Sequence, residues 1–164
     1  MKITEKSKDN VYYRARLIAA ERDDRLASRA SAAEMIGVSE YTLRDYELGI
    51  ARAVPVEIVV IMSELYNAPE LKNGYCKYEC PIGKQMALAT EVRSLEGITL
   101  RLLKEFDPDK IRALQHKLID ITEDGKVSAD ERPEMERILD TLDDLAEVIS
   151  EMKLAGEKVM GESK

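Results

Sequence analysis

The chain of 164 residues contains no tryptophan, one phenylalanine, one histidine and two cysteines. So little aromatic material argues against one large, compact core. The sequence also offers no phosphate-binding glycine loop, no Ser/His/Asp set built on its single histidine and no acid pair at catalytic spacing. We therefore expect no enzymatic activity.

Long hydrophobic runs are also missing. No apolar stretch approaches the ~20 residues that a membrane-spanning helix needs. Residues 1–6 lack the apolar core of a secretory signal peptide. The composition, 45% hydrophobic and 35% charged, is typical of a soluble, helix-rich protein. We therefore expect a cytoplasmic protein with no membrane partner.

An excess of basic residues is absent as well. Residues 1–75 contain 11 Lys/Arg and 12 Asp/Glu, and residues 76–164 contain 14 and 20, so the two halves carry net charges of −1 and −6. Duplex DNA favours basic surfaces through counterion release, and neither half is basic overall. The basic residues of the first half are mostly arginines, which suit phosphate and guanine contacts. The acidic second half is expected to meet a protein partner.

The most informative stretch, residues 33–49, reads as two short helices joined by a tight turn, with the sequence AEMIGVSEYTLRDYELG. Such a unit presents its second helix to the major groove of DNA. Ala33 is small enough for close helix approach, and Gly37 allows the positive backbone angle that ends the first helix. Ser39 can cap the second helix, and Leu43 is expected to face the core.

This stretch resembles the Cro/lambda-repressor-like family of helix-turn-helix proteins, also called the XRE family. The matching residues are the block 33–37, Val38-Ser39, Leu43 and the run Tyr46-Glu47-Leu48-Gly49. The resemblance extends over residues 10–72 and implies five helices in a DNA-binding domain. We place that domain at residues 1–75, and read it as part of an all-α protein.

The resemblance implies that the helix around residues 39–48 reads double-stranded DNA, with Arg29 and Arg52 holding phosphates. The expected contact residues are Arg29, Ser39, Glu40, Tyr41, Thr42, Arg44, Asp45 and Arg52. Arg44 can donate two hydrogen bonds to guanine, and Glu40 can accept one from cytosine. The alternative is a solvated helix face with a Glu40–Arg44 ion pair. In this family the acid at Glu47 is buried against an arginine, here Arg16 or, alternatively, Arg14.

Flanking segments are also predicted to be helical. Residues 11–20 have helical composition, with apolar residues at 11, 15 and 18, and Ser28 can cap the helix that follows. Pro55 suits the first position of a helix that Asn67 closes. A short further turn is expected to start at Pro69 and to end at Asn73-Gly74.

Two cysteines, Cys76 and Cys80, lie in a predicted linker over residues 76–84. The simplest interpretation is that they pack the linker onto the first domain. Zinc held by four thiolates of a dimer and redox behaviour are the alternatives, whereas a disulfide is not expected in a reducing cytoplasm. We predict no cofactor. His116 is expected to flank an amphipathic helix without chemistry of its own.

Residues 85–164 are predicted to form a helical self-association module. Apolar residues recur at steps of three and four from Met86 onward, and Asp107-Pro108 starts a new helix. The final helix carries an apolar stripe at Met135, Ile138, Leu142, Leu145, Ile149, Met152 and Val159. Stripes this narrow are most economically covered by a second chain, which favours a homodimer. An intramolecular three-helix bundle is the alternative.

Residues 120–131 imitate a calcium-binding EF-hand loop, with acids at three loop positions and Gly125 at the turn. Pro133 would clash in a helix that starts where that loop requires one. A helix capped by Asp130 accommodates Pro133 but moves Glu131 out of its calcium geometry. We therefore favour a glycine-centred turn between two helices.

Together these features predict a two-part, all-α, repressor-like transcriptional regulator that binds specific DNA sequences as a dimer. The alternative is a protein-interaction adaptor that uses a helix-turn-helix fold without DNA. The net charge of −7 and the acidic residues on the exposed helix face favour that alternative.

Overall fold

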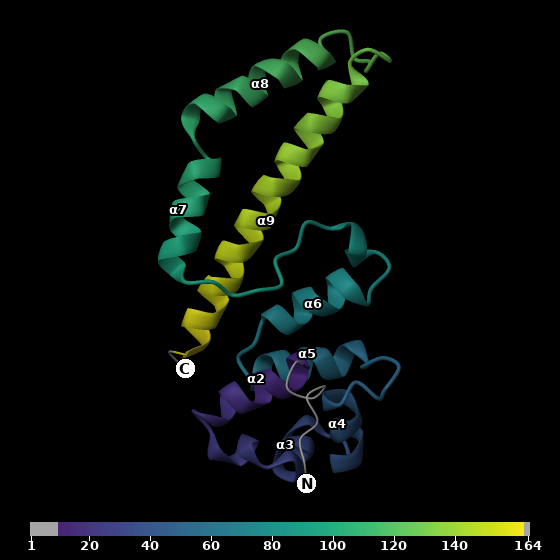
Figure 1. Ribbon diagram of the computed structural model, residues 1–164, viewed down its shortest axis with the longest axis vertical. Coiled ribbons are helices and arrows are strands. Elements are labelled where there is room, and N and C mark those ends of the chain that lie inside the picture. Colours follow the sequence, from purple (N-terminus) through teal and green to yellow (C-terminus); the bar gives the residue numbers. More distant parts are fainter. Residues whose placement is uncertain (1–9, 163–164) are drawn as a thin grey trace. The chain divides into compact units, whose positions relative to one another are not determined.

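The computed structural model describes residues 10–162, and within this range the secondary structure is helical, without a strand (Figure 1). The all-α prediction is confirmed. The chain forms two units: the first comprises the described residues up to Met86 together with those from Glu157 onward, and the second is Ala87–Gly156. Among the described residues, none of the helices combines the length and the apolar character needed to cross a membrane.

The first unit contains α2 (Val11–Ala20), the short 3₁₀ helix η1 (Asp24–Ala27), α3 (Arg29–Ile36), α4 (Glu40–Glu47), α5 (Val56–Leu65), α6 (Glu70–Tyr78) and η2 (Gly83–Gln85). α3 packs against η1, α4 and α5, while α2 packs against η1 and α4, and α6 packs against α5 and η2. Their shared core is built largely from small and branched side chains, with the largest fully buried ones being Tyr66, Leu26, Leu43 and Met62.

Side-chain caps fix where these helices begin and end. Asn10 accepts hydrogen bonds from the backbone amides of residues 12 and 13 at the start of α2. Ser28 caps α3, and Ser39 caps α4 by accepting from the amide of Thr42 at 3.0 Å. Gly37 ends α3 with a φ of +84°, which L side chains rarely adopt. The capping roles predicted for Ser28, Gly37 and Ser39 are confirmed.

Two local expectations for this unit are wrong. The helix that was expected to end at Asn73-Gly74 continues to Tyr78 as α6. The reason is tertiary packing: η2 folds back on α6 so closely that a Cβ on Gly83 would lie 2.2 Å from the carbonyl oxygen of Cys76. Pro55 lies one position before the helix, at the N-cap of α5, and not in its first turn.

The buried side of α2 also differs from its apolar pattern. Val11 and Ile18 are 49% and 52% exposed, whereas the helix buries Tyr13, Ala15, Arg16 and Ala19. Arg16 is charged but lies on the core side of α2, because its ion-pair partner, Glu47, is buried on α4. Residue periodicity alone does not show this.

The second unit contains α7 (Leu95–Glu105), α8 (Pro108–Thr122) and most of α9 (Arg132–Glu162). Ser94 and Asp107 cap α7 and α8 by accepting backbone amide hydrogen bonds, as expected for Asp107. The helical pattern predicted from Met86 onward is wrong for residues 86–94, which are not helical because α7 begins only after its cap at Ser94.

The apolar stripe predicted for the last helix is only partly buried. Ile138 is buried, but Leu142 and Ile149 are 40% and 43% exposed. The side of α9 that is buried within the unit instead carries Val148, Glu151 and Leu154. The carboxylate of Glu151 accepts a hydrogen bond from Arg101 of α7. The unit is therefore held partly by an ion pair whose carboxylate is buried, and part of the stripe stays open to solvent.

The loop between α8 and α9 is the predicted glycine-centred turn. Gly125 has a φ of +73°, and the Glu131 carboxylate accepts from the backbone amide of Ser128 at 2.8 Å. Hydrogen bonding from the side chain of Ser128, together with that from its backbone amide, lowers the pKa of Glu131. α9 begins at Arg132, one residue later than a cap at Asp130 would start it. Pro133 therefore lies in the first turn of the helix.

Two of the seven tyrosines of the chain are shielded from ionisation. Burial, helped by Glu79 and Tyr75, raises the pKa of Tyr12 to about 12, and burial also raises that of Tyr66. The folded state therefore favours the neutral phenol of Tyr12. Its contribution to stability is complete below pH 10, the unperturbed pKa, and is lost as the pH rises towards 12.

We expect Tyr12→Phe to remove a late step from the ultraviolet titration of tyrosinate in the folded protein. The control Tyr41→Phe removes a tyrosine that is 65% exposed, and should leave this late step in place. Loss of an early step from the Tyr12 variant would contradict the burial assigned to this side chain.

Candidate nucleic-acid interface

α3 and α4 are joined by the three-residue turn 37–39, and α4 combines a buried side with an open one. Leu43 and Glu47 are completely buried, whereas Glu40 and Tyr41 are exposed. The buried pair fixes α4 to the unit. Its N-terminal residues are therefore presented to solvent in a fixed orientation.

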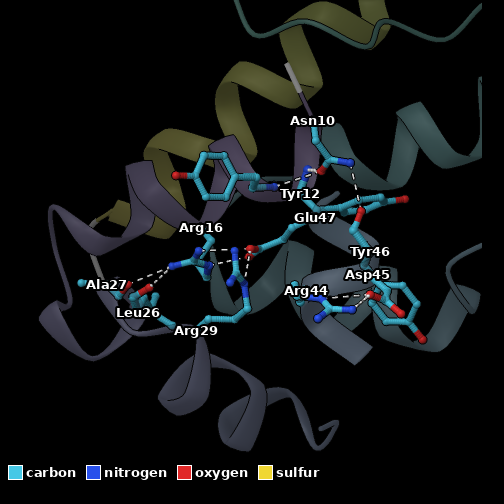
Figure 2. A network of polar contacts seen from close by, with 11 residues as sticks. Asn10, Tyr12, Arg16, Leu26, Ala27, Arg29, Arg44, Asp45, Tyr46 and Glu47 are labelled. Atoms are coloured by element: carbon cyan, nitrogen blue, oxygen red, sulfur yellow. Dashed lines mark hydrogen bonds and ion pairs between the residues drawn. The ribbon is translucent and has the colours of Figure 1, made fainter. Parts of the chain in front are cut away.

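Glu47, a fully buried carboxylate at the end of α4, is the centre of a polar network (Figure 2). Its Oε1 accepts from Arg16 Nε at 2.5 Å, and its Oε2 accepts from Arg16 Nη2 at 3.2 Å. Arg29 Nε donates to the same Oε2 at 2.8 Å. The predicted Arg16–Glu47 pair is confirmed, and the second arginine was not foreseen.

Arg16 extends this network to a third element. Its Nη1 donates to the carbonyl oxygens of Leu26 at 2.8 Å and Ala27 at 3.1 Å, and its guanidinium lies 5.5 Å from the ring centroid of Tyr13. Arg16 is 3% exposed, so its charge is stable in the core only because the carboxylate and these carbonyls compensate its desolvation. One side chain therefore joins α2, η1 and α4.

Asn10 provides a further link between α2 and α4. While its Oδ1 caps α2, its Nδ2 donates to the carbonyl oxygen of Tyr46 at 3.0 Å (Figure 2). The capping role is visible in the sequence, since an asparagine directly precedes an apolar helical run. Its contact with Tyr46, 36 residues away, is decided by the tertiary structure.

On the open side of α4, Arg44 is held by its neighbours. Its guanidinium lies 3.8 Å from the ring centroid of Tyr41, and its Nε and Nη2 donate to Asp45 Oδ1 at 3.1 and 2.8 Å. Hydrogen bonding to Asp45 and to Tyr41 raises the pKa of Arg44, which stays charged. The ion pair that the alternative interpretation placed between Glu40 and Arg44 thus forms with Asp45.

The eight predicted contact residues all lie in the first unit. Ser39, Glu40, Tyr41 and Arg52 are exposed, and Thr42, Arg44, Asp45 and Arg29 are partly buried. The side chain of Arg29 is 17% exposed, because it turns towards Glu47. Residues of α4 and of the turn before it thus form one surface, and Arg29 borders the buried network.

Both cysteines are free and half-buried. Cys76 lies inside α6, and the carbonyl oxygen of Cys80 accepts from the amide of Lys84 at 3.1 Å. Over residues 10–162, no three side chains of the His, Cys, Asp and Glu types are grouped so that they could hold a metal ion.

A comparison of the chain with protein-family models, curated proteins and solved structures finds no match. Assignment to the helix-turn-helix family that the sequence resembles therefore stays a prediction.

Replacing Glu47 by alanine should lower the free energy of unfolding by about 3–5 kcal/mol, because Arg16 would stay buried without its carboxylate. Denaturant titration of the full chain measures this change. Glu34→Ala is the matched control, since Glu34 is exposed on α3 and its loss should cost no more than about 0.5 kcal/mol. Equal stability of the two variants would show that the network does not hold the unit together.

Proposed function

We propose that the protein is a sequence-specific DNA-binding transcriptional regulator of the repressor type, which binds duplex DNA as a homodimer through the helix around residues 39–48. The observation that carries this proposal is the division of α4 into two sides. Leu43 and Glu47 anchor it, and Glu40, Tyr41 and Arg44 remain on its open side. A helix of this kind fits the major groove, where polar side chains can contact base edges.

Arg44 is the side chain best suited to read a base. Only its Nε and Nη2 are used on Asp45, and a guanidinium has five N–H donors. The remaining donors of Nη1 and Nη2 can bind the two acceptors of guanine side by side. Stacking on Tyr41 reduces the conformational freedom that Arg44 would lose on binding.

Arg29 and Arg52 are proposed to contact phosphates. Arg52 is exposed beyond α4. Arg29 uses its Nε on Glu47, so its terminal amino groups would have to make the contact. Because Glu47 and Asp45 neutralise part of the local positive charge, we expect phosphate contacts to contribute less to affinity than in a strongly basic domain.

The homodimer is proposed to form through the C-terminal helices. Leu142 and Ile149 are seven residues apart on α9 and lie on the same side of the helix. Both stay substantially exposed in the single chain, at 40% and 43%. Covering them with a second copy would bury apolar surface and place two reading helices on two half-sites.

A protein-interaction adaptor is the second candidate. The observation that favours it is the pairing of both Arg44 and Arg29 with acids of the same chain. Together with the net charge of −7, this pairing limits the attraction of a polyanion. A chain with this net negative charge would suit a basic protein partner.

Selection from a pool of random duplex DNA, at two salt concentrations, separates the two candidates. For the regulator we expect enrichment of a paired half-site motif and an affinity that falls as salt rises. Folded protein that retains no DNA above background would overturn the DNA-binding proposal and favour the adaptor.

Arg44→Ala should weaken binding to the selected site by ~1–3 kcal/mol and relax the preference at one base position. Arg25→Ala is a matched control, because it also removes one positive charge and one ion pair with a nearby aspartate, in this case Asp23. The control should change affinity much less. Equal losses in the two variants would mean that Arg44 contributes only charge.

Leu142→Glu should shift the protein from dimer to monomer in sedimentation equilibrium, since a carboxylate would be buried in the proposed interface. Thr141→Glu adds the same charge at the neighbouring exposed position and should leave the dimer intact. A Leu142 variant that self-associates like the wild-type chain would exclude this face as the interface.

A further inference from the structure

The C-terminal end of α9 belongs to the first unit and contacts the corner between α5 and α6. Asn67 Nδ2, at this corner, donates to the carbonyl oxygen of Lys158 at 3.0 Å. Lys158 Nζ donates to Glu70 Oε1 at 3.3 Å, and Lys72 Nζ lies 3.9 Å from Glu157 Oε2. Three polar contacts thus join the helix end to residues that precede it by 85 to 91 positions.

Asn67 and Gly161 fit each other sterically. Asn67 has a φ of +49°, a left-handed conformation that asparagine tolerates better than most residues. A Cβ added to Gly161 would lie 2.0 Å from Asn67 Oδ1 and 2.8 Å from its Cγ. The amide of Asn67 therefore occupies the space that any larger residue at position 161 would need.

Gly156 of the same helix has a different environment. It lies where the chain passes from the second unit to the first, and a Cβ added there would meet no atom within 4 Å. Packing does not require glycine at this position. A glycine inside a helix weakens it, because its backbone loses more freedom on folding than that of alanine. Gly156 therefore weakens α9 at the boundary between the units without a packing reason.

We propose that residues 157–161 form a latch, which closes on the α5–α6 corner through Asn67 and opens by yielding of the helix at Gly156. The chain connects the two units at Met86–Ala87 and again at Gly156–Glu157. When the latch is open, residues 157–161 no longer contact the first unit. The two units are then joined only at Met86–Ala87. The contacts that close it are polar and partly solvent-exposed, so opening requires far less free energy than unfolding of the unit.

The latch gives the C-terminal module a way to influence the first unit. Any partner, including a second copy, that binds the open form better will open the latch by mass action. If the proposed DNA-binding function holds and DNA binds the open and closed forms with different affinities, module association and DNA affinity are linked by the same factor in both directions. The latch itself does not depend on DNA.

Hydrogen exchange of the full chain without DNA tests the latch. Intrinsic helix propensity predicts that alanine in place of either glycine strengthens α9. The latch predicts opposite results: Gly161→Ala should lower the protection of amides 157–161 up to about tenfold, the effect of losing one hydrogen bond. Gly156→Ala should keep or raise that protection. Protection that rises in both variants would overturn the proposal.

The variant Asn67→Gly separates the steric fit from general damage, because glycine keeps the left-handed backbone while the amide is removed. Amides 157–161 should lose protection in this variant as well. In its background, Gly161→Ala should cause no further loss, because the atoms that it would strike are gone. An additive further loss would contradict the assigned contact. Failure of the DNA selection would leave these results unaffected.

Discussion

The first unit depends on a carboxylate that has no exposure to water. Glu47 is compensated by two arginines, Arg16 and Arg29, and Arg16 also binds the carbonyls of Leu26 and Ala27. A buried charge is tolerated only when its partners are in place. The positions of α2, η1, α3 and α4 are therefore coupled, because each element supplies at least one member of the network.

This constraint also shapes the proposed DNA-binding surface. Because Glu47 and Leu43 hold one side of α4, the opposite side is presented in a fixed orientation. The charge on that surface is largely balanced within the chain, through Arg44 with Asp45 and Arg29 with Glu47. Such a surface favours contacts that depend on geometry over contacts that depend on net attraction, which fits selective recognition better than tight non-specific binding.

Local sequence signals located much of this architecture. Ser28, Gly37, Ser39 and Asp107 each act at the helix boundary that their chemistry predicts, because capping needs only neighbouring amides. The Arg16–Glu47 pair followed from the family resemblance. The end of α6, the non-helical segment 86–94 and the exposed side of α2 were predicted wrongly, since composition does not report which segments pack against them.

The sequence by itself determined the helical class, several of the caps and the division of α4 into an anchored and an open side. These features depend on residues within a turn or two of one another. Only the tertiary structure decided that Arg29 joins Glu47, that Arg44 pairs with Asp45 and not with Glu40, and that Asn67 meets Lys158 and Gly161. Those contacts depend on side-chain direction and on close approach between distant segments, for which a single sequence carries no local signal.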